Sequence, residues 1–374
     1  MTTGSSGGAL TTTPPQAGRA PTGGPPLAKR LAGAMAFDKV GAVYVWIAIV
    51  IVFSVWVPET FPTLDTAKQI LNTNAITGLA ALAITIPLAA RVFDLSFAYV
   101  MTLCGVIVAE LMVGGMALVP ALLVGLGAGL LIGLINAVVV VVARIDSFIG
   151  TLATGSLIQA LITMVTDDTT VSGVELSGGF AEIGQTDIAG ITLPVIYCAL
   201  VAVAIWYLLE HTATGRRLYA TGFNPDASRL AGVPVNKLRF VSLLISGGLA
   251  GAAGIVLAST LGSGSPTAGT PYLLPAFAAV FLGATQLKNG RFNAGGTIIA
   301  VLLLGTGTTG LALAAAPQWS QAMFVGIVLI AALAVTSIQR RATVRGRGSG
   351  VHGGGVAGTD QPGVGTSTPV TTED

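Results

Sequence analysis

The chain has 374 residues, of which 53% are hydrophobic and only 9% are charged. A soluble domain usually carries about 25% charged residues, so this composition excludes an ordinary water-soluble protein, and the formal net charge of +2 is too small to predict nucleic-acid binding. The bilayer is the solvent that the composition indicates. We expect an all-α polytopic membrane protein, because helices satisfy their own backbone hydrogen bonds in lipid.

Uncharged apolar runs predict about ten transmembrane helices, since a crossing needs roughly 20 apolar residues. The runs lie at 40–57, 70–90, 95–109, 111–143, 147–166, 188–209, 240–287 and 292–339. The last two each have the length of two spans and are divided by turn-forming residues around Gly264 and Pro317. We expect a hairpin at Gly114-Gly115, with the third span ending and the fourth beginning there.

The placement of charges predicts the orientation, because cytoplasmic loops are enriched in Lys and Arg. Residues 210–239 contain five basic residues, whereas 167–187 contain five acidic residues and no basic one. Basic residues also flank both ends of the apolar region. We therefore expect a transmembrane domain over 37–341, a cytoplasmic loop at 210–239, and both termini in the cytoplasm.

The segments outside this domain, 1–36 and 342–374, are rich in Gly, Thr, Ser and Pro. Such composition does not bury enough apolar surface to fold alone. We predict that both are disordered cytoplasmic tails.

Catalytic groups are scarce in the apolar segments. Both histidines lie in polar segments, and the dipeptide Gly-Lys of a phosphate-binding loop does not occur. We therefore expect no enzyme activity, no ATPase site, no metal site and no bound cofactor. Glu110 is the one acidic residue embedded in apolar sequence, and its position beside Gly114-Gly115 favours an interfacial carboxylate over a functional one.

Polar and small residues inside the spans each allow two interpretations. Asn72, Asn74 and Asn136 can line a polar path or bridge helices. A second group consists of two sets of glycines spaced four residues apart, and the members of each set share one face of their helix. This spacing predicts close helix packing, with subunit association as the alternative. These glycines are Gly125, Gly129, Gly133, Gly247 and Gly251.

The cytoplasmic loop predicts a short helix over 224–231. Asn224 is a good N-cap, Pro225 suits the first helical position, Asp226 complements the helix dipole, and Gly232 can end the helix. A small apolar face of Ala227, Leu230 and Ala231 follows from this register. A capped helix of this kind favours docking into a groove of another protein over a solvated connector.

Two groups of residues resemble the permease subunits of bacterial ribose-type ABC importers, and the likeness extends over about 37–341. The first is Gly215-Arg216, Tyr219-Ala220, Gly222, Asn224, Ala227 and Gly232, and the second is Gly262-Ser263-Gly264, Pro266, Ala268-Gly269 and Tyr272. The stretches Asp94-Leu95-Ser96 and Phe148-Ile149-Gly150-Thr151-Leu152 are also similar to the family.

The resemblance implies a multi-pass protein of the bacterial cytoplasmic membrane that pairs with a second permease copy. It also implies a sugar delivered by an extracytoplasmic binding protein, a cytoplasmic ATPase as the driving partner, and two halves of opposite orientation. Residues implied in coupling to the ATPase are Gly215, Arg216, Tyr219, Gly222, Asn224, Pro225, Asp226, Ala227, Leu230 and Gly232. Residues expected along the pathway are Asn72, Asn74, Asn136, Ser263 and Tyr272.

The chain departs from the family pattern at two positions. Leu273 and Pro275 stand where ribose permeases commonly have acidic residues, so a different cargo is plausible.

The main alternative to an ABC importer is a secondary transporter driven by an ion gradient, which usually keeps ionisable groups near the midplane. A membrane enzyme is disfavoured by the missing His and acidic clusters.

Overall fold

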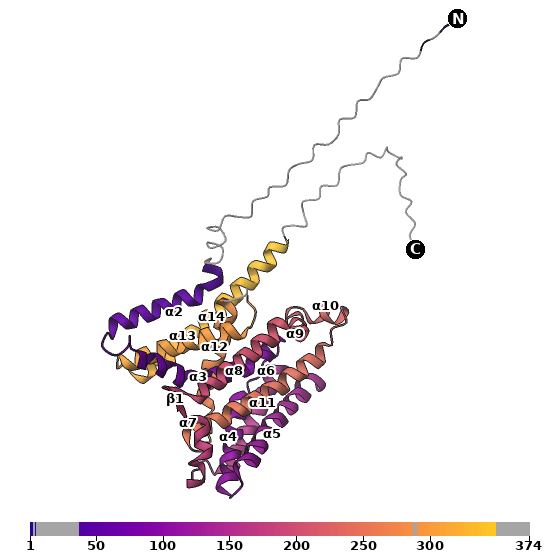
Figure 1. Ribbon diagram of the computed structural model, residues 1–374. Coiled ribbons are helices and arrows are strands. Elements are labelled where there is room, and N and C mark those ends of the chain that lie inside the picture. The colour runs from indigo at the N-terminus through magenta and orange to yellow at the C-terminus, as the bar shows by residue number, and fades with distance from the viewer. Residues whose placement is uncertain (3, 5–36, 287–289, 349–374) are drawn as a thin grey trace, which may run out of the picture.

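The computed structural model describes residues 1–2, 4, 37–286 and 290–348, and this part of the chain is almost entirely helical (Figure 1). The elements in chain order are α2 (Phe37–Trp56), α3 (Leu64–Ala89), α4 (Phe97–Val113), α5 (Leu118–Ala137), the π-helical turn η1 (Val138–Val142), α6 (Ser147–Thr166), the 3₁₀ turn η2 (Val174–Leu176), α7 (Gly179–Gln185), β1 (Asp187–Ile188), β2 (Ile191–Thr192), α8 (Leu193–His211), α9 (Ala213–Phe223), α10 (Pro225–Leu230), α11 (Val235–Leu261), the 3₁₀ turn η3 (Thr270–Tyr272), α12 (Leu273–Gln286), α13 (Ala294–Leu313) and α14 (Gln318–Gly348).

Each of the ten predicted spans coincides with a helix. Within the described ranges, six helices are long and apolar enough to cross a membrane by themselves: α3, α5 with η1, α6, α8, α11 and α13. Shorter apolar stretches occur in α2, α4, α12 and α14 and around η3. The chain is therefore an all-α polytopic membrane protein. In the part that the structure covers, it has a single β-hairpin, whose two strands have two residues each.

Only short parts of the predicted tails lie among the described residues. The tail at 1–36 lies almost wholly outside the described residues, as does 349–374. At the other boundary the prediction was wrong, because α14 continues past residue 341 to Gly348. No proline interrupts this stretch, and its arginines are good helix formers, so the helix continues into polar sequence.

Turn residues and capping side chains mark where helices begin and end, at the breaks between the apolar runs. The predicted hairpin at Gly114-Gly115 is confirmed, and Gly115 has a φ of +89° between α4 and α5. The hydroxyl of Thr63 accepts from the Thr66 N–H at the start of α3, and the Asn293 side chain accepts from the Gly296 N–H at the start of α13. Gly262 ends α11 with a φ of +63°, a backbone conformation that favours glycine.

Three helices form the centre of the bundle. The most apolar stretches of α3, α11 and α13 are 67%, 61% and 61% buried, whereas those of α5 and α8 are each 22% buried. Helix α11 packs on α4 and α5, while α12 packs on α13 and α14. Helix α3 contacts both α11 and α13 and so joins these two groups.

Backbone contact joins α5 to α11 at the glycines for which the sequence predicts close packing. A Cβ atom on Gly129 would lie 2.7 Å from the Gly247 carbonyl oxygen, and one on Gly133 would lie 2.8 Å from the Leu243 carbonyl oxygen. Real Cβ atoms do not approach so closely, so only glycine fits at these crossings. The interpretation as close helix packing is confirmed.

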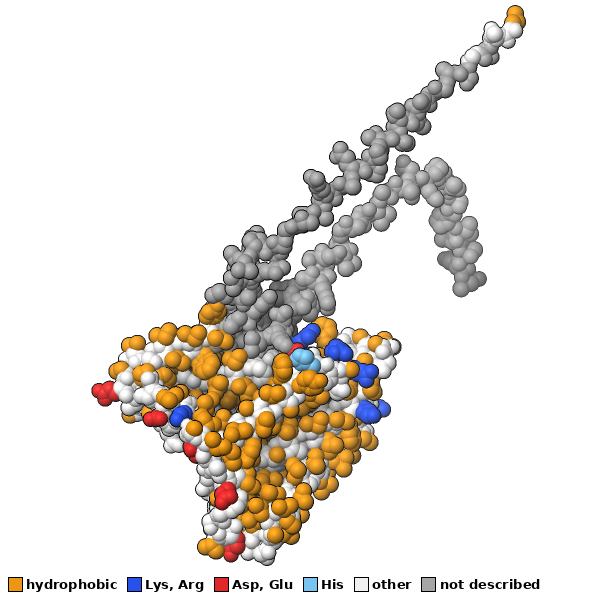
Figure 2. Space-filling view, in the orientation of Figure 1, with side chains coloured by type: hydrophobic (Ala, Val, Ile, Leu, Met, Phe, Trp, Pro, Cys, Tyr) orange, Lys and Arg blue, Asp and Glu red, His pale blue; other side chains and the backbone are white. Residues whose placement is uncertain are grey.

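The acidic segment between α6 and α8 carries structure that the sequence analysis did not predict. It contains η2, α7 and the β1–β2 hairpin, whose turn residues Ala189 and Gly190 have φ values of +57° and +87°. The Val171 N–H donates to the Gly264 carbonyl at 2.9 Å, which ties the segment to the chain after α11. On the face shown in Figure 2, red acidic side chains lie mainly toward the lower and left edges, and most blue basic ones lie at the upper right.

Candidate functional site

The cytoplasmic loop predicted at 210–239 folds into two helices, α9 and α10, which project from one end of the bundle (Figure 1). Only α10 was predicted from the sequence. Helix α9 begins at a capping residue, Thr212, whose hydroxyl accepts from the Gly215 N–H at 3.1 Å. It buries Gly215, Leu218 and Thr221, so it lies on the bundle as an amphipathic helix.

The capped form of α10 is confirmed. The Asn224 side-chain oxygen accepts from the Asp226 N–H at 3.1 Å and from the Ala227 N–H at 3.0 Å. Pro225 is the first helical residue, and Gly232 leaves the helix with a φ of +77°. The predicted end is close to the observed one, since α10 ends at Leu230.

The apolar side chains of α10 point away from the bundle. Leu230 is 91% exposed and Phe223, at the end of α9, is 72% exposed. Ala227 and Ala231 are also exposed, whereas Ser228 is buried on the opposite side. Large exposed apolar side chains on a loop outside the spans are typical of a surface that another protein covers.

Two glycines allow α9 to lie directly on neighbouring backbone. A Cβ atom on Gly222 would overlap the Ala89 carbonyl at the end of α3, and one on Gly215 would overlap the Leu209 carbonyl at the end of α8. Helix α9 therefore packs directly on the ends of two candidate spans, α3 and α8.

Tyr219 connects α9 to the segment before α13. Its hydroxyl lies 2.9 Å from the Phe292 carbonyl and 3.2 Å from the Glu210 carboxylate, and the Arg291 guanidinium lies over its ring at 5.4 Å. Burial raises the pKa of Tyr219, and the neighbouring Glu210 carboxylate raises it further, so the hydroxyl keeps its proton and donates. Arg216 and Asp226, in contrast, are exposed.

The five predicted pathway residues make no hydrogen bonds with one another in the described part of the chain. They are Asn72, Asn74, Asn136, Ser263 and Tyr272.

Each asparagine instead makes its own local contacts. The Asn72 side chain donates to the Gly190 carbonyl and accepts from the Thr192 N–H, both at 3.0 Å, so it holds the β-hairpin against α3. Asn74 donates to the Ile70 carbonyl of its own helix. Asn136 donates to the Ser96 hydroxyl at 2.7 Å. For Asn136 the geometry favours the helix-bridging interpretation, which the sequence had left open, since it joins α5 to the start of α4. Asn72 joins α3 to the β-hairpin instead. Ser263 and Tyr272 are half-buried.

The carboxylate of Asp94 is buried, which the sequence did not predict. This residue lies between the predicted apolar runs 70–90 and 95–109, but its side chain is only 1% exposed. Its oxygens accept from the Ser96 N–H at 3.1 Å, the Ser96 hydroxyl at 2.7 Å and the Ser246 hydroxyl at 2.7 Å. Burial raises the pKa of Asp94, and the donated hydrogen bonds partly offset this effect. Glu110, which the sequence singled out, is half-buried in the last turn of α4.

The chain is similar to transport-system permeases over most of its length. The family described as the permease component of branched-chain amino acid transport systems matches residues 66–333. The ribose import permease protein of Bacillus subtilis is 34% identical over 79% of this chain and 92% of its own length. The L-arabinose transport system permease protein of Escherichia coli K12 is 31% identical over 82% of this chain and 92% of its own length.

The D-allose transport system permease protein of Escherichia coli K12 is 29% identical over 81% of this chain. No solved structure matches the chain. The match to the family and the coverage of the ribose and arabinose permeases agree with the helical membrane bundle described above. The chain therefore belongs to the permease family of ABC importers, the family that includes these ribose, allose and arabinose permeases.

Proposed function

We propose that this chain forms the translocation pathway of an ATP-driven importer for a monosaccharide or a similar small polar solute. The observation that carries the proposal is the likeness to import permeases for ribose and arabinose over about nine-tenths of their length. The departures at Leu273 and Pro275 favour a sugar other than ribose. The chain supplies the route, and a separate subunit hydrolyses ATP.

The proposed topology has ten crossings, both termini in the cytoplasm, and two inverted halves of five spans. The separation of charge supports the orientation, since most basic side chains on the visible face gather toward the end that carries α9 and α10 (Figure 2). Both ends of the described helical region, at the start of α2 and the end of α14, lie at the upper side of the bundle with α10 (Figure 1). An odd number of spans per half gives repeats opposite orientations.

The proposed partners occupy different faces. We place the cytoplasmic ATPase on α10, where Leu230 and Ala227 present exposed apolar surface between polar caps. A solute-binding protein is expected at the acidic end, and a second permease copy completes the pathway. No cofactor is proposed for this chain.

The test is uptake into vesicles that contain the chain with its ATPase and binding protein. Leu230→Asp and Ala227→Glu are expected to abolish ATP-dependent uptake and co-purification of the ATPase while membrane insertion is unchanged, because each buries a charge in the docked surface. The matched control is Ala213→Asp, which adds a charge to the same loop at the exposed first residue of α9, where a carboxylate suits the helix dipole.

Two results would contradict the proposal. Undiminished uptake in both α10 variants would remove the assignment of the docking helix. Uptake that continues without ATP and stops when an ion gradient is collapsed would replace the ATP-driven importer by a secondary transporter.

A further inference from the structure

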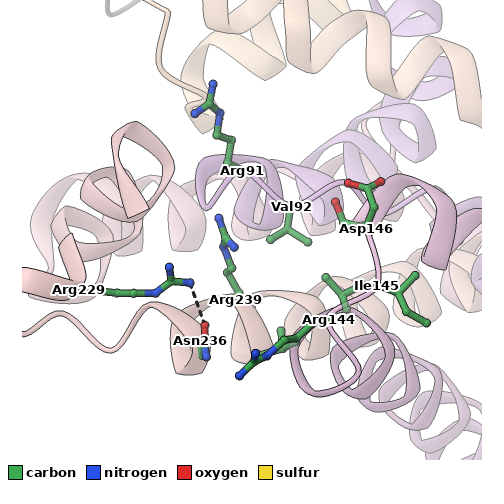
Figure 3. Close-up of a pocket in the computed structure, with 11 residues that line it drawn as sticks. Arg91, Val92, Arg144, Ile145, Asp146, Arg229, Asn236 and Arg239 are labelled. Atoms are coloured by element: carbon green, nitrogen blue, oxygen red, sulfur yellow. Dashed lines mark hydrogen bonds between the residues drawn. The ribbon is translucent and has the colours of Figure 1, made fainter. Parts of the chain in front are cut away.

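A cavity lies beside α10, between three segments that are distant in the sequence (Figure 3). Its volume is about 630 Å³. The segments are the turn after α3, the stretch from η1 to the start of α6, and the region from α10 to the first turns of α11. The lining residues are Arg91, Val92, Val140, Val141, Arg144, Ile145, Asp146, Ser147, Arg229, Asn236 and Arg239.

The cavity has an excess of positive charge. It is lined by four arginines and a single carboxylate, that of Asp146. This carboxylate is already engaged, because it accepts from the Phe148 N–H at 3.0 Å and the Ile149 N–H at 3.3 Å as the N-cap of α6. Among the residues that the structure describes, the one salt bridge joins Arg229 to Asp226 at 2.9 Å, and Asp226 does not line the cavity.

One unmet donor points to an anionic ligand. The Nε of Arg239 is buried and has no hydrogen-bond partner among the described atoms. An unpaired buried donor of a charged group costs more free energy than a neutral one. Arg91 and Arg144 have φ values of +62° and +59°, which cost a side-chain-bearing residue on the order of 1 kcal/mol or more. Strained positions that carry arginine rather than glycine are typical of a functional site.

The walls of the cavity indicate which kind of anion fits. Val92, Val140, Val141 and Ile145 also line the cavity, so apolar side chains lie among the guanidinium groups. Next to it, α5 with η1 and α6 are candidate spans. Their ends leave Val142 and Ile149 each 65% exposed and Phe148 50% exposed. A ligand that satisfies both surfaces carries a negative headgroup and a hydrocarbon chain.

We infer that this cavity binds the phosphate headgroup of an anionic phospholipid, with the acyl chains lying along the exposed apolar ends of α5 and α6. Arginines bind phosphate through several N–H donors at once, and basic pockets between transmembrane helices bind acidic lipid headgroups. Because Arg229 belongs to α10, the lipid would lie against the helix proposed to dock the ATPase. The inference requires only that this end of the bundle lies at a membrane surface.

Native mass spectrometry of the full-length chain in detergent tests the inference. Phosphatidylglycerol and phosphatidylcholine with the same acyl chains are titrated against the wild type and the variants. We expect the wild type to prefer phosphatidylglycerol, and Arg91→Gln/Arg144→Gln to weaken its binding by about tenfold or more. Arg144→Lys keeps the charge at a strained position and is expected to retain most of the binding.

The matched control is Arg217→Gln, which removes the same charge from the exposed face of α9 outside the cavity. Its lipid binding is expected to equal that of the wild type. Arg144→Gln alone is expected to give an intermediate loss, which separates a local effect from a failure of the double variant to fold.

Three results would overturn the inference. The first is equal binding of both lipids by the wild type. The second is displacement of phosphatidylglycerol by inorganic phosphate at comparable concentration, which would identify a soluble anion as the ligand. The third is a double variant that keeps its lipid binding but loses its ATPase subunit or second permease copy, which would assign the arginines to an acidic protein surface.

Discussion

The hydroxyl of Ser246 in α11 donates a hydrogen bond to the buried carboxylate of Asp94, with 2.7 Å between the two oxygens. Asp94 precedes α4, and Ser96 at the start of that helix accepts in turn from the Asn136 side chain of α5. One buried carboxylate therefore holds the turn after α3 against two further helices.

Replacing Asp94 by Ala is expected to lower the free energy of unfolding by about 3 kcal/mol, because it leaves buried hydroxyl donors without an acceptor. Unfolding in mixed detergent micelles, followed by circular dichroism, measures the change. Asp168→Asn is the control, since Asp168 is exposed and its φ of +58° suits asparagine. An Asp94→Ala variant as stable as the control would mean that the network contributes nothing.

Gly129→Ala and Gly247→Ala are expected to destabilise the protein by about 1–3 kcal/mol each, since the added methyl group meets backbone on the facing helix. The control is Gly127→Ala on the same helix, where a Cβ atom would have no neighbour within 4 Å. That variant is expected to be as stable as the wild type or slightly more stable. Thermal aggregation in detergent compares the three variants, and equal melting temperatures would contradict backbone contact.

Tyr219→Phe is expected to reduce uptake more than it reduces ATP hydrolysis, because the lost hydroxyl connects α9 to the Phe292 carbonyl before α13. The ratio of solute imported to ATP hydrolysed is the quantity to measure. Tyr207→Phe is the control, since Tyr207 lies on α8 with its ring stacked on His211 and is 59% exposed. A normal ratio in Tyr219→Phe would show that this hydroxyl does not couple the two segments.

Asn224→Ala removes the N-cap of α10 and is expected to cost about 1 kcal/mol of local helix stability. Since α10 has only six residues, we expect a several-fold fall in ATP-dependent uptake. Asn224→Asp keeps an acceptor at the same position and is expected to restore uptake. The prediction fails if both variants transport alike.

Local signals in the sequence were sufficient to predict the helices of the bundle and α10. Uninterrupted apolar runs located each helix of the bundle, and the hairpin at Gly114-Gly115 and the caps of α10 follow from residue types with strong backbone preferences. Glycine spacing also predicted a close-packing face on α5 and on α11, because a four-residue repeat fixes one helix face whatever the fold. It did not predict that these two faces meet each other.

The network around Asp94 could not be predicted in the same way. Asp94 lies in a short charged connection between two apolar runs, a position typical of a solvent-exposed loop residue. Only the packing of α5 and α11 against this connection buries its carboxylate. Helix α9 was missed because its Thr and Gly residues favour turns in isolation, while packing on Ala89 and Leu209 stabilises the helix. The same holds for the hairpin that Asn72 fixes to α3.

The backbone contact between α5 and α11 limits how the protein can change shape. Side chains between helices can change rotamer and let the helices slide, but Gly129 and Gly247 leave no side chain to adjust. We therefore expect the two helices to move together during transport. Alternating access would then come from rotation at helix contacts whose side chains can change rotamer, such as those between α3 and the group of α12, α13 and α14.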